Sequence, residues 1–150
     1  MAYWDWDLSY GVGVAEIDKQ HRKLVQYINE LHDSCVRNDR NVVKNTLAGL
    51  TDYIVAHCSF EEELMKRARY PMFAQHKSEH DAFASSINKY KTTFNSGGDI
   101  AGQLMAELQI WLTHHAVQGG AMYRDCMQKI FIEEKNSTRQ SWLQNIFSFL

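Results

Sequence analysis

Proline is nearly missing from this chain, since Pro71 is the single proline among 150 residues. A fold built from many short strands needs many turns, and proline is one of the residues that tight turns favour. The scarcity therefore argues against a β-rich fold. The apolar residues instead recur at helical spacing almost throughout the chain, which predicts an all-α protein.

Long apolar runs and an excess of basic residues are also missing. The chain has no stretch of about 18 apolar residues and no cationic leader followed by an apolar segment. Its formal net charge is −2, and no basic run with interleaved aromatic residues occurs. These absences argue against a membrane span and against a nucleic-acid surface. We expect a soluble cytoplasmic protein.

Cysteine is scarce, and its spacing forms no disulfide or metal-binding pattern. The three cysteines, Cys35, Cys58 and Cys126, include no CxxC pair, and their number is odd. A disulfide framework normally uses an even number of cysteines. The sequence therefore predicts free thiols in a reducing compartment.

Four long helical segments follow an aromatic N-terminal arm. Trp4, Trp6 and Tyr10 in the arm are expected to pack on one end of the helices. Apolar periodicity, together with turn signals at RNDRN, Pro71 and SGG, predicts helices over residues 18–37, 41–68, 72–94 and 100–132. Short loops favour antiparallel neighbours, so we expect an up-down-up-down four-helix bundle over residues 1–132, arm included.

A separate amphipathic segment, NSTRQSWLQNIFSFL, ends the chain. We predict a short C-terminal helix in this tail, residues 133–150, capped by Ser137 or Thr138. Its apolar face would consist of Trp142, Leu143, Ile146 and Leu150. Three interpretations stay open: docking on the bundle, a homodimer or protein-partner contact through residues 137–150, and a membrane-surface anchor. The anchor is the weakest, because Arg139 is the one basic residue of the segment.

Histidines carry the chemical information in this sequence. His57 and Glu61 are four residues apart on the second predicted helix, and His76 and His80 are four residues apart on the third. On a helix this spacing leaves two side chains about 40° apart, so both reach one point. A lone histidine on an apolar face is more often a hydrogen-bonded core residue than a ligand, so one such pair would not establish a metal site.

His21 on the first helix and His115 on the fourth complete a set in which every helix offers a donor. Imidazole and carboxylate without thiolate suit iron, zinc or manganese. Six such groups exceed one four-coordinate site and suit two metals that share Glu61 as a bridge. Two further histidines, His32 and His114, are expected at the surface or in a supporting position, and Glu62 and Glu63 are expected to be solvated charges on the helix face.

Four ordered segments match the motifs of one known family. They are WDWDLSYGVGVAEIDKQH, HCSFEEELM, YPMFAQHKSEH and WLTHH. They resemble, in that order, the tryptophan arm with the first ligand, the HxxxE segment, the Tyr-Pro loop with HxxxH, and the WLxxH of the bacterial hemerythrins. The last motif selects His115 rather than His114 as the ligand. The resemblance covers roughly residues 3–131 and implies the four-helix fold of that family.

The resemblance also implies a cofactor and a ligand pocket. It implies two iron ions with Glu61 as the bridge between them. One ion would be held by His76, His80 and His115, and the other by His21 and His57. The oxygen-binding pocket would be lined by Trp111, Cys58, Ala116, Gly120 and Tyr123.

One position departs from the family pattern. The family places a second bridging aspartate five residues after the last histidine ligand, where this chain has Gly120. Tyr123 matches the family's tyrosine, so the register of the match is sound. Gln118 and Asp125 are weak substitutes, because an amide is a poor bridge and Asp125 lies about 7.5 Å further along the helix. We expect an opened centre, with water, hydroxide or a small carboxylate in the gap, or else a site that has lost its function.

The leading hypothesis is therefore a di-iron protein that binds dioxygen for transport, storage or sensing. This would make it a binding protein rather than an enzyme. One alternative is an opened di-iron centre with oxidase-like or peroxidase-like activity. Another is a metal-impaired interaction module that uses its C-terminal helix.

Overall fold

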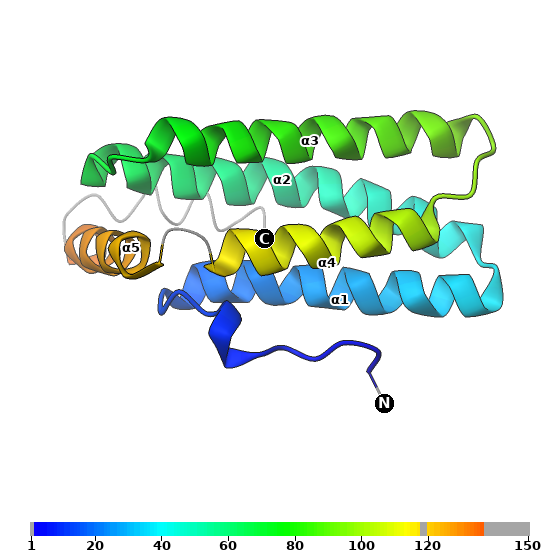
Figure 1. The fold of residues 1–150 in the computed structure, drawn as a ribbon, viewed down its shortest axis with the longest axis horizontal. Coiled ribbons are helices and arrows are strands. Elements are labelled where there is room, and N and C mark those ends of the chain that lie inside the picture. The colour runs from blue at the N-terminus through cyan, green and yellow to red at the C-terminus, as the bar shows by residue number, and fades with distance from the viewer. Residues whose placement is uncertain (1, 118–119, 137–150) are drawn as a thin grey trace.

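The protein is all-α in the computed structural model, which describes residues 2–117 and 120–136 (Figure 1). Consecutive helices among α1 to α4 run antiparallel, which confirms the predicted up-down-up-down bundle. The elements, in chain order, are η1 (Leu8–Tyr10), α1 (Ala15–Arg37), α2 (Arg40–Ala68), α3 (Phe73–Asn95), α4 (Ala101–Val117) and α5 (Gly120–Lys135). The predicted helix over residues 137–150 lies outside the described residues.

Local chemistry explains where the helices begin and end. Asn38 and Arg69 adopt left-handed φ values of 52° at the C-terminal ends of α1 and α2, which stops each helix. The Asp39 carboxylate then accepts hydrogen bonds from the first free backbone N–H groups of α2. Pro71 separates α2 from α3, as the sequence predicts.

The prediction of one continuous helix over residues 100–132 is wrong. α4 ends at Val117 and α5 begins at Gly120. Figure 1 shows α5 beyond the end of α4 and turned steeply away from the α4 axis. Each glycine inside a helix costs about 1 kcal/mol relative to alanine, so Gly119 and Gly120 favour a break at this point. α5 packs against α2.

Two apolar clusters fill the bundle, and the histidines lie where the clusters meet. On α1, the second cluster ends at Ile17 and the first begins at Leu24. On α2, the first cluster ends at Tyr53 and the second begins at Phe60. Each fully buried large apolar side chain contributes about 1.5–3 kcal/mol, so both flanks are firmly packed. His21 and His57 are consequently held between two well-packed regions.

The N-terminal arm lies along the side of the bundle rather than on its end. Figure 1 shows it running back beside α1. The Asn29 side chain fixes it, because this amide accepts a hydrogen bond from the Trp4 N–H and donates one to the Trp4 carbonyl, both at 2.8 Å. Tyr3 stacks on His32 with ring centroids 4.2 Å apart. The expected aromatic residues do pack on the first cluster: Trp4, Trp6 and Tyr10.

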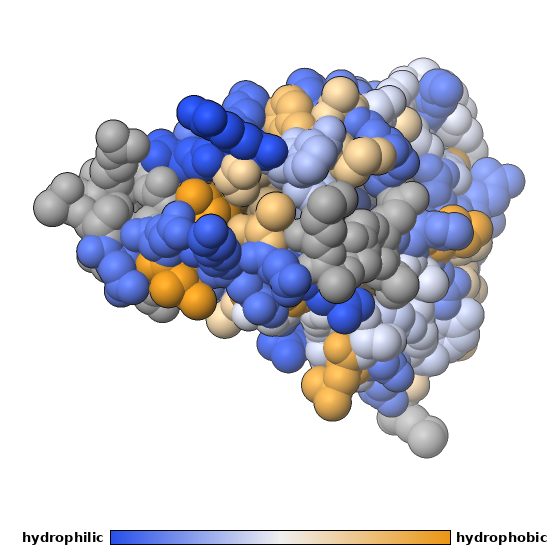
Figure 2. Space-filling model, turned by 60° about the vertical axis from the view of Figure 1, so that its left-hand side comes forward, coloured by the Kyte–Doolittle hydropathy of each residue, from blue (hydrophilic) through white to orange (hydrophobic). Residues whose placement is uncertain are grey.

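The described surface is mixed in character. Apolar side chains appear in Figure 2 as separate patches among hydrophilic ones. No helix in the described part of the chain is long and apolar enough to cross a membrane. The three cysteines are free thiols, as predicted; Cys35 is exposed, and Cys58 and Cys126 are half-buried.

Candidate metal centre

The six predicted ligands come together in the interior of the bundle. α1 supplies His21, α2 supplies His57 and Glu61, α3 supplies His76 and His80, and α4 supplies His115. All six are buried, and the most accessible of them, His76, is 6% exposed. As expected from the i,i+4 spacing, both members of each pair on α2 and α3 face the same interior point.

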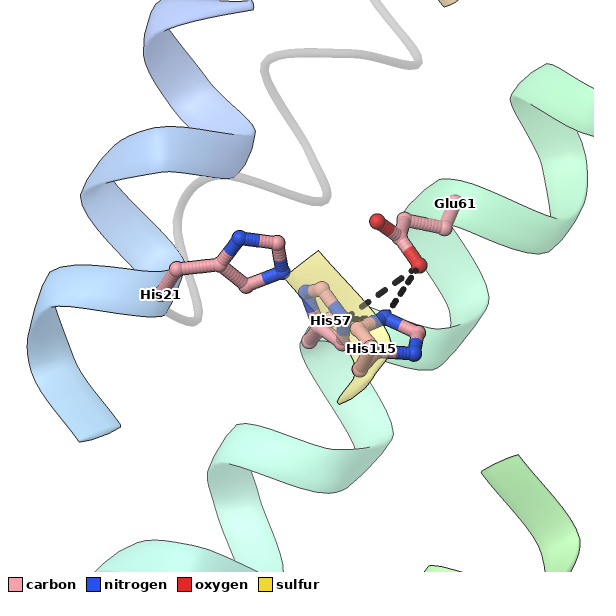
Figure 3. Close-up of side chains that lie close together, drawn as sticks. All are labelled: His21, His57, Glu61 and His115. Carbon is pink, nitrogen blue, oxygen red and sulfur yellow. Dashed lines mark hydrogen bonds and ion pairs between the residues drawn. The ribbon is translucent and has the colours of Figure 1, made fainter. Parts of the chain in front are cut away.

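The six side chains form two overlapping donor sets. In each set the donor atoms lie within 4.8 Å of one another. One set is His21, His57, Glu61 and His115, which Figure 3 shows converging from three helices. The other set is Glu61, His76, His80 and His115. Glu61 and His115 belong to both sets, so the cluster is one continuous polar centre with two halves.

The Glu61 carboxylate is the focus of this centre. Its Oε2 lies 3.0–3.3 Å from the Nε2 atoms of the four nearest imidazoles, which are His57, His76, His80 and His115. Its Oε1 accepts a hydrogen bond from the Tyr123 hydroxyl on α5. Burial alone would raise its pKa, but His57 and His115 outweigh burial and hold the pKa of Glu61 well below 4.5. The carboxylate is thus an anion at neutral pH.

His21 provides the clearest sign that a cation belongs here. Neither of its ring nitrogens has a well-aligned hydrogen-bond partner among the described residues, although the side chain is completely buried; the Tyr10 backbone is near enough to raise the pKa of the ring against the effect of burial. Burial lowers the pKa of His21 to about 3, so the ring is neutral and keeps a lone pair for a metal. A buried imidazole without partners is costly. A metal ion held by His21 and its neighbours would remove that cost, so the donor set fits a transition metal.

Two further residues orient the imidazoles. The Gln20 Oε1 lies 2.6 Å from the Nδ1 of His57, and the Glu62 Oε1 lies 3.0 Å from the Nδ1 of His80. If each Nδ1 donates its proton to these oxygens, each Nε2 is left facing Glu61 with a free lone pair. Such partners are the usual means of fixing a metal-binding histidine.

Sequence reasoning missed both residues. Gln20 is 2% exposed, and the only feature of the sequence that could have pointed to it is its position directly before His21. Glu62 was expected to be a solvated charge, but its side chain is 16% exposed and contacts His80 on another helix. Nothing local in the sequence predicts a contact across 18 positions.

Aromatic rings surround the centre on several sides. Trp111 stacks on His115 with ring centroids 4.1 Å apart, and Phe83 also stacks on this tryptophan, at 4.2 Å. Tyr53 stacks on His57, and Tyr123 stacks on His76. Of the predicted pocket residues, Trp111 and Tyr123 therefore stack on candidate ligands. Such rings limit the access of water to the polar centre.

The other predicted pocket residues are placed differently. Ala116 is buried beside His115 in the chain and belongs to the first apolar cluster. Cys58 is half-buried, its thiol is hydrogen-bonded to His80, and burial raises its pKa. Gly120 is the first residue of α5.

The weak substitutes for a second bridge gain no support from the structure. Asp125 is exposed on α5, and Gln118 lies outside the described residues. His114 is exposed and His32 is half-buried, as predicted for groups outside the ligand set.

Comparison with known proteins identifies one family. The hemerythrin HHE cation binding domain matches residues 12–118, which contain all six candidate ligands. A bacteriohemerythrin of Stenotrophomonas maltophilia is 34% identical over 125 residues, which cover 83% of this chain and 82% of that protein. A bacteriohemerythrin of Pseudomonas aeruginosa is 31% identical over 144 residues, which cover 95% of this chain and 94% of that protein.

A solved structure gives the same result for the fold. The crystal structure of a wild-type hemerythrin superposes with a TM-score of 0.76 at 28% sequence identity. The superposition covers 84% of this chain and 98% of the other. The similarity therefore extends over nearly the whole of that protein.

Proposed function

We propose, since this chain belongs to the hemerythrin family, that its buried centre holds two iron ions and binds dioxygen for transport, storage or sensing. The observation that supports this most is the pair of overlapping donor sets that share Glu61. Two sets with one common carboxylate match a bridged pair of metal ions better than a single four-coordinate ion.

The family resemblance assigns the ligands to the two halves. His76, His80 and His115 would hold one iron, and His21 and His57 the other, with Glu61 between them. When bound, the iron pair supplies the reversible electron exchange with dioxygen that imidazole and carboxylate groups cannot perform alone. This chain's own residues supply orientation, charge and shielding.

The protein groups around Glu61 prepare the centre for metal. Tyr123 holds one carboxylate oxygen, which leaves the other directed at the imidazoles. Gln20 and Glu62 fix the orientation of His57 and His80. The stacked Trp111 keeps one side of His115 apolar. Together these contacts keep the donors in place in a buried, water-poor environment.

This chain differs from the family pattern in lacking the second bridging aspartate, because position 120 is a glycine. Imidazoles bind metal in their neutral form, so one carboxylate and five imidazoles would leave two divalent ions with a net positive charge. A glycine at position 120 also provides no side chain that could serve as a second bridge. We therefore include in the proposal an external water, hydroxide or small carboxylate as an additional ligand.

The first test is the metal content of the protein. The chain is loaded with ferrous iron without oxygen, desalted, and its iron is counted per chain. Two irons per chain, absent from the Glu61→Gln variant, would support the bridged pair. One iron or none in the unaltered chain would contradict it, and a mononuclear, zinc or partner-binding role would replace reversible oxygen binding.

The second test separates a carrier from an enzyme. An oxygen carrier changes its visible absorption when oxygen is added and returns to the starting spectrum when oxygen is removed. Complete return over several cycles supports oxygen binding. Rapid irreversible oxidation together with turnover of peroxide would contradict it and favour an oxidase-like or peroxidase-like centre.

A further inference from the structure

A groove of about 480 Å³ lies between α2 and α3, near the start of α2 and the end of α3. Figure 1 shows that these two helices run side by side and that this end of the bundle lies opposite α5. No residue of either donor set lines the groove, so it is separate from the candidate metal centre. Its lining residues are Lys44, Leu47, Ala48, Thr51, Asp52, Lys91, Phe94 and Asn95.

The floor of the groove is apolar, and small side chains on α2 leave room above it. Leu47 is 3% exposed and belongs to the first apolar cluster, and Phe94 packs against the same cluster. Ala48 and Thr51 are too short to fill the space between two helices whose axes lie about 8–10 Å apart. The Thr51 hydroxyl donates to the Leu47 carbonyl at 3.0 Å, so its one donor is already used.

The register between the two helices places both lysines of the groove at one level. The Arg40 guanidinium donates hydrogen bonds to the Phe94 carbonyl at 3.0 Å and to the Gly98 carbonyl at 3.1 Å. Lys44 follows Arg40 by four residues, about 6 Å along α2, and Lys91 precedes Phe94 by three, about 4.5 Å along α3. Because the helices are antiparallel, both displacements point in the same direction. The two lysines therefore face each other across the groove.

These two lysines have no internal charge to satisfy them. Neither forms a hydrogen bond or an ion pair with another residue in the part of the chain that the structure describes. Lysine side chains are cationic at neutral pH. Asp52 is the one acidic residue of the lining, and it lies eight residues after Lys44, about 12 Å further along α2. The groove thus has a cationic end, an apolar floor and an anionic far end.

We propose that this groove binds a medium-chain fatty acid such as octanoate. Its carboxylate would lie between Lys44 and Lys91, and its acyl chain would cover Leu47 and Ala48 towards the far end. Ligand sites in proteins usually have volumes of about 300–1,000 Å³ and apolar walls with a few placed polar groups, as this groove does. The Asp52 carboxylate repels a second anionic group, which disfavours dicarboxylates and polyphosphates.

The site does not depend on the proposed metal centre, and it can be tested in the whole chain without added metal. Octanoate is titrated into the protein, and the backbone amide shifts are followed by NMR. We expect saturable shifts at Ala48 and Thr51, with a Kd below about 1 mM. Glu61→Gln removes the shared carboxylate of the metal centre and should leave octanoate binding unchanged, so the two proposals can fail separately.

Removing the two cations tests the recognition of the carboxylate. Lys44→Gln/Lys91→Gln should weaken octanoate binding by about tenfold, because ion pairs near a protein surface each contribute a few-fold. Octan-1-ol, which has the same chain without the charge, should bind equally weakly to both proteins. The matched control is Lys89→Gln/Lys129→Gln, which removes two exposed lysines outside the groove and should change nothing.

Filling the groove tests its apolar floor without a change in charge. Ala48→Phe should abolish the binding of both octanoate and octan-1-ol, because the larger side chain occupies the place of the acyl chain. Ala82→Phe makes the same change at an exposed position of α3 outside the groove and should bind octanoate normally.

Four results would overturn the proposal. Octanoate could cause no saturable shift in the unaltered chain. It could bind equally well to the groove variants and to their controls, which would place it elsewhere. Octan-1-ol could bind as tightly as octanoate, which would leave the lysines without a role. Finally, the chain could bind vesicles of phosphatidylcholine and phosphatidylglycerol but no free octanoate, and the groove would then be part of a membrane-binding surface.

Discussion

At the scale of single residues, Glu61 has the largest role in the centre. Four imidazole Nε2 atoms lie within 3.3 Å of its Oε2, and Tyr123 holds its other oxygen. It is the single carboxylate in both donor sets of the described residues. The charge balance of any bound metal pair therefore depends on this residue and on whatever stands near Gly120.

The substitution Gly120→Asp tests that charge balance. An added carboxylate should stabilise ferric more than ferrous iron, so the reduction potential should fall. It should also slow the loss of iron by about tenfold or more. The measurements are iron content during dialysis and a redox titration. Gly120→Asn is the matched control without charge, and equal potentials and iron retention in all three proteins would contradict the argument.

Gln20 is the second residue whose role can be isolated. Gln20→Leu keeps a similar volume but removes the oxygen that lies 2.6 Å from the His57 Nδ1. We expect metal affinity to fall by about 10- to 100-fold, because His57 loses its fixed tautomer and orientation. The affinity is measured by competition with a chelator. Gln26→Leu, an exposed position on the same helix, should leave it unchanged.

At the scale of helices, α1 and α2 are brought close together by a glycine. A Cβ at Gly49 on α2 would lie 2.9 Å from the Tyr27 Cζ on α1, and Tyr27 is buried. A Cβ at Gly102 on α4 would meet no heavy atom within 4 Å. An added methyl group should therefore clash with a neighbouring helix at Gly49 and meet no other atom at Gly102.

The two alanine substitutions should shift stability in opposite directions. Gly49→Ala should lower the free energy of unfolding by about 1–2 kcal/mol, because overpacking outweighs the gain in helix propensity. Gly102→Ala should raise it by about 0.5 kcal/mol, because only the propensity changes. Urea unfolding of the metal-free protein measures both. A stabilising Gly49→Ala would show that the contact between α1 and α2 is not tight.

The helices and the candidate ligands could be predicted from the sequence, whereas the break after Val117, the position of the arm and the role of Glu62 could not. Periodicity and the spacing of His57 with Glu61 are local properties, so they predicted the bundle and its interior donors. The break after Val117 depends on how α5 packs against α2, which the glycines suggested but did not determine. The arm is held in position by Asn29, and Glu62 contacts His80 on α3. Both contacts join residues far apart in the sequence, so local patterns could not predict them.

At the scale of the whole molecule, the buried imidazoles make the metal-free protein sensitive to acid. Burial lowers the pKa of His21 to about 3 and lowers the pKa of His57 and His115 as well. Below about pH 6.5 the unfolded chain takes up protons at these histidines, and the folded chain does not. Their contribution to stability is therefore present above about pH 6.5 and is lost as the pH falls.

The expected slope can be measured. Each imidazole that stays neutral costs about 1.4 kcal/mol of unfolding free energy per pH unit of acidification. His80 acts in the opposite direction: although burial favours its neutral form, hydrogen bonds to Cys58 and Glu61 raise its pKa to about 11. Its contribution is fully present below about pH 6.5 and is lost as the pH rises towards 11.

Stability of the metal-free protein should therefore be greatest near neutral pH. Urea unfolding between pH 5 and 9 measures this, and His21→Leu should flatten the acid side. His114→Leu, at an exposed position, is the matched control and should leave the slope unchanged. Constant stability between pH 7.5 and 5.5 would contradict the prediction.

The hydrogen bond from Tyr123 to Glu61 joins α5 to the buried centre. Thermodynamic linkage is reciprocal, so two events that share a group must influence each other by the same factor. Any occupant that favours one position of the carboxylate also favours one position of α5. Conversely, any molecule that holds α5 in place changes the affinity of that occupant. Occupancy of the interior and the placement of α5 are thus coupled through this one hydrogen bond.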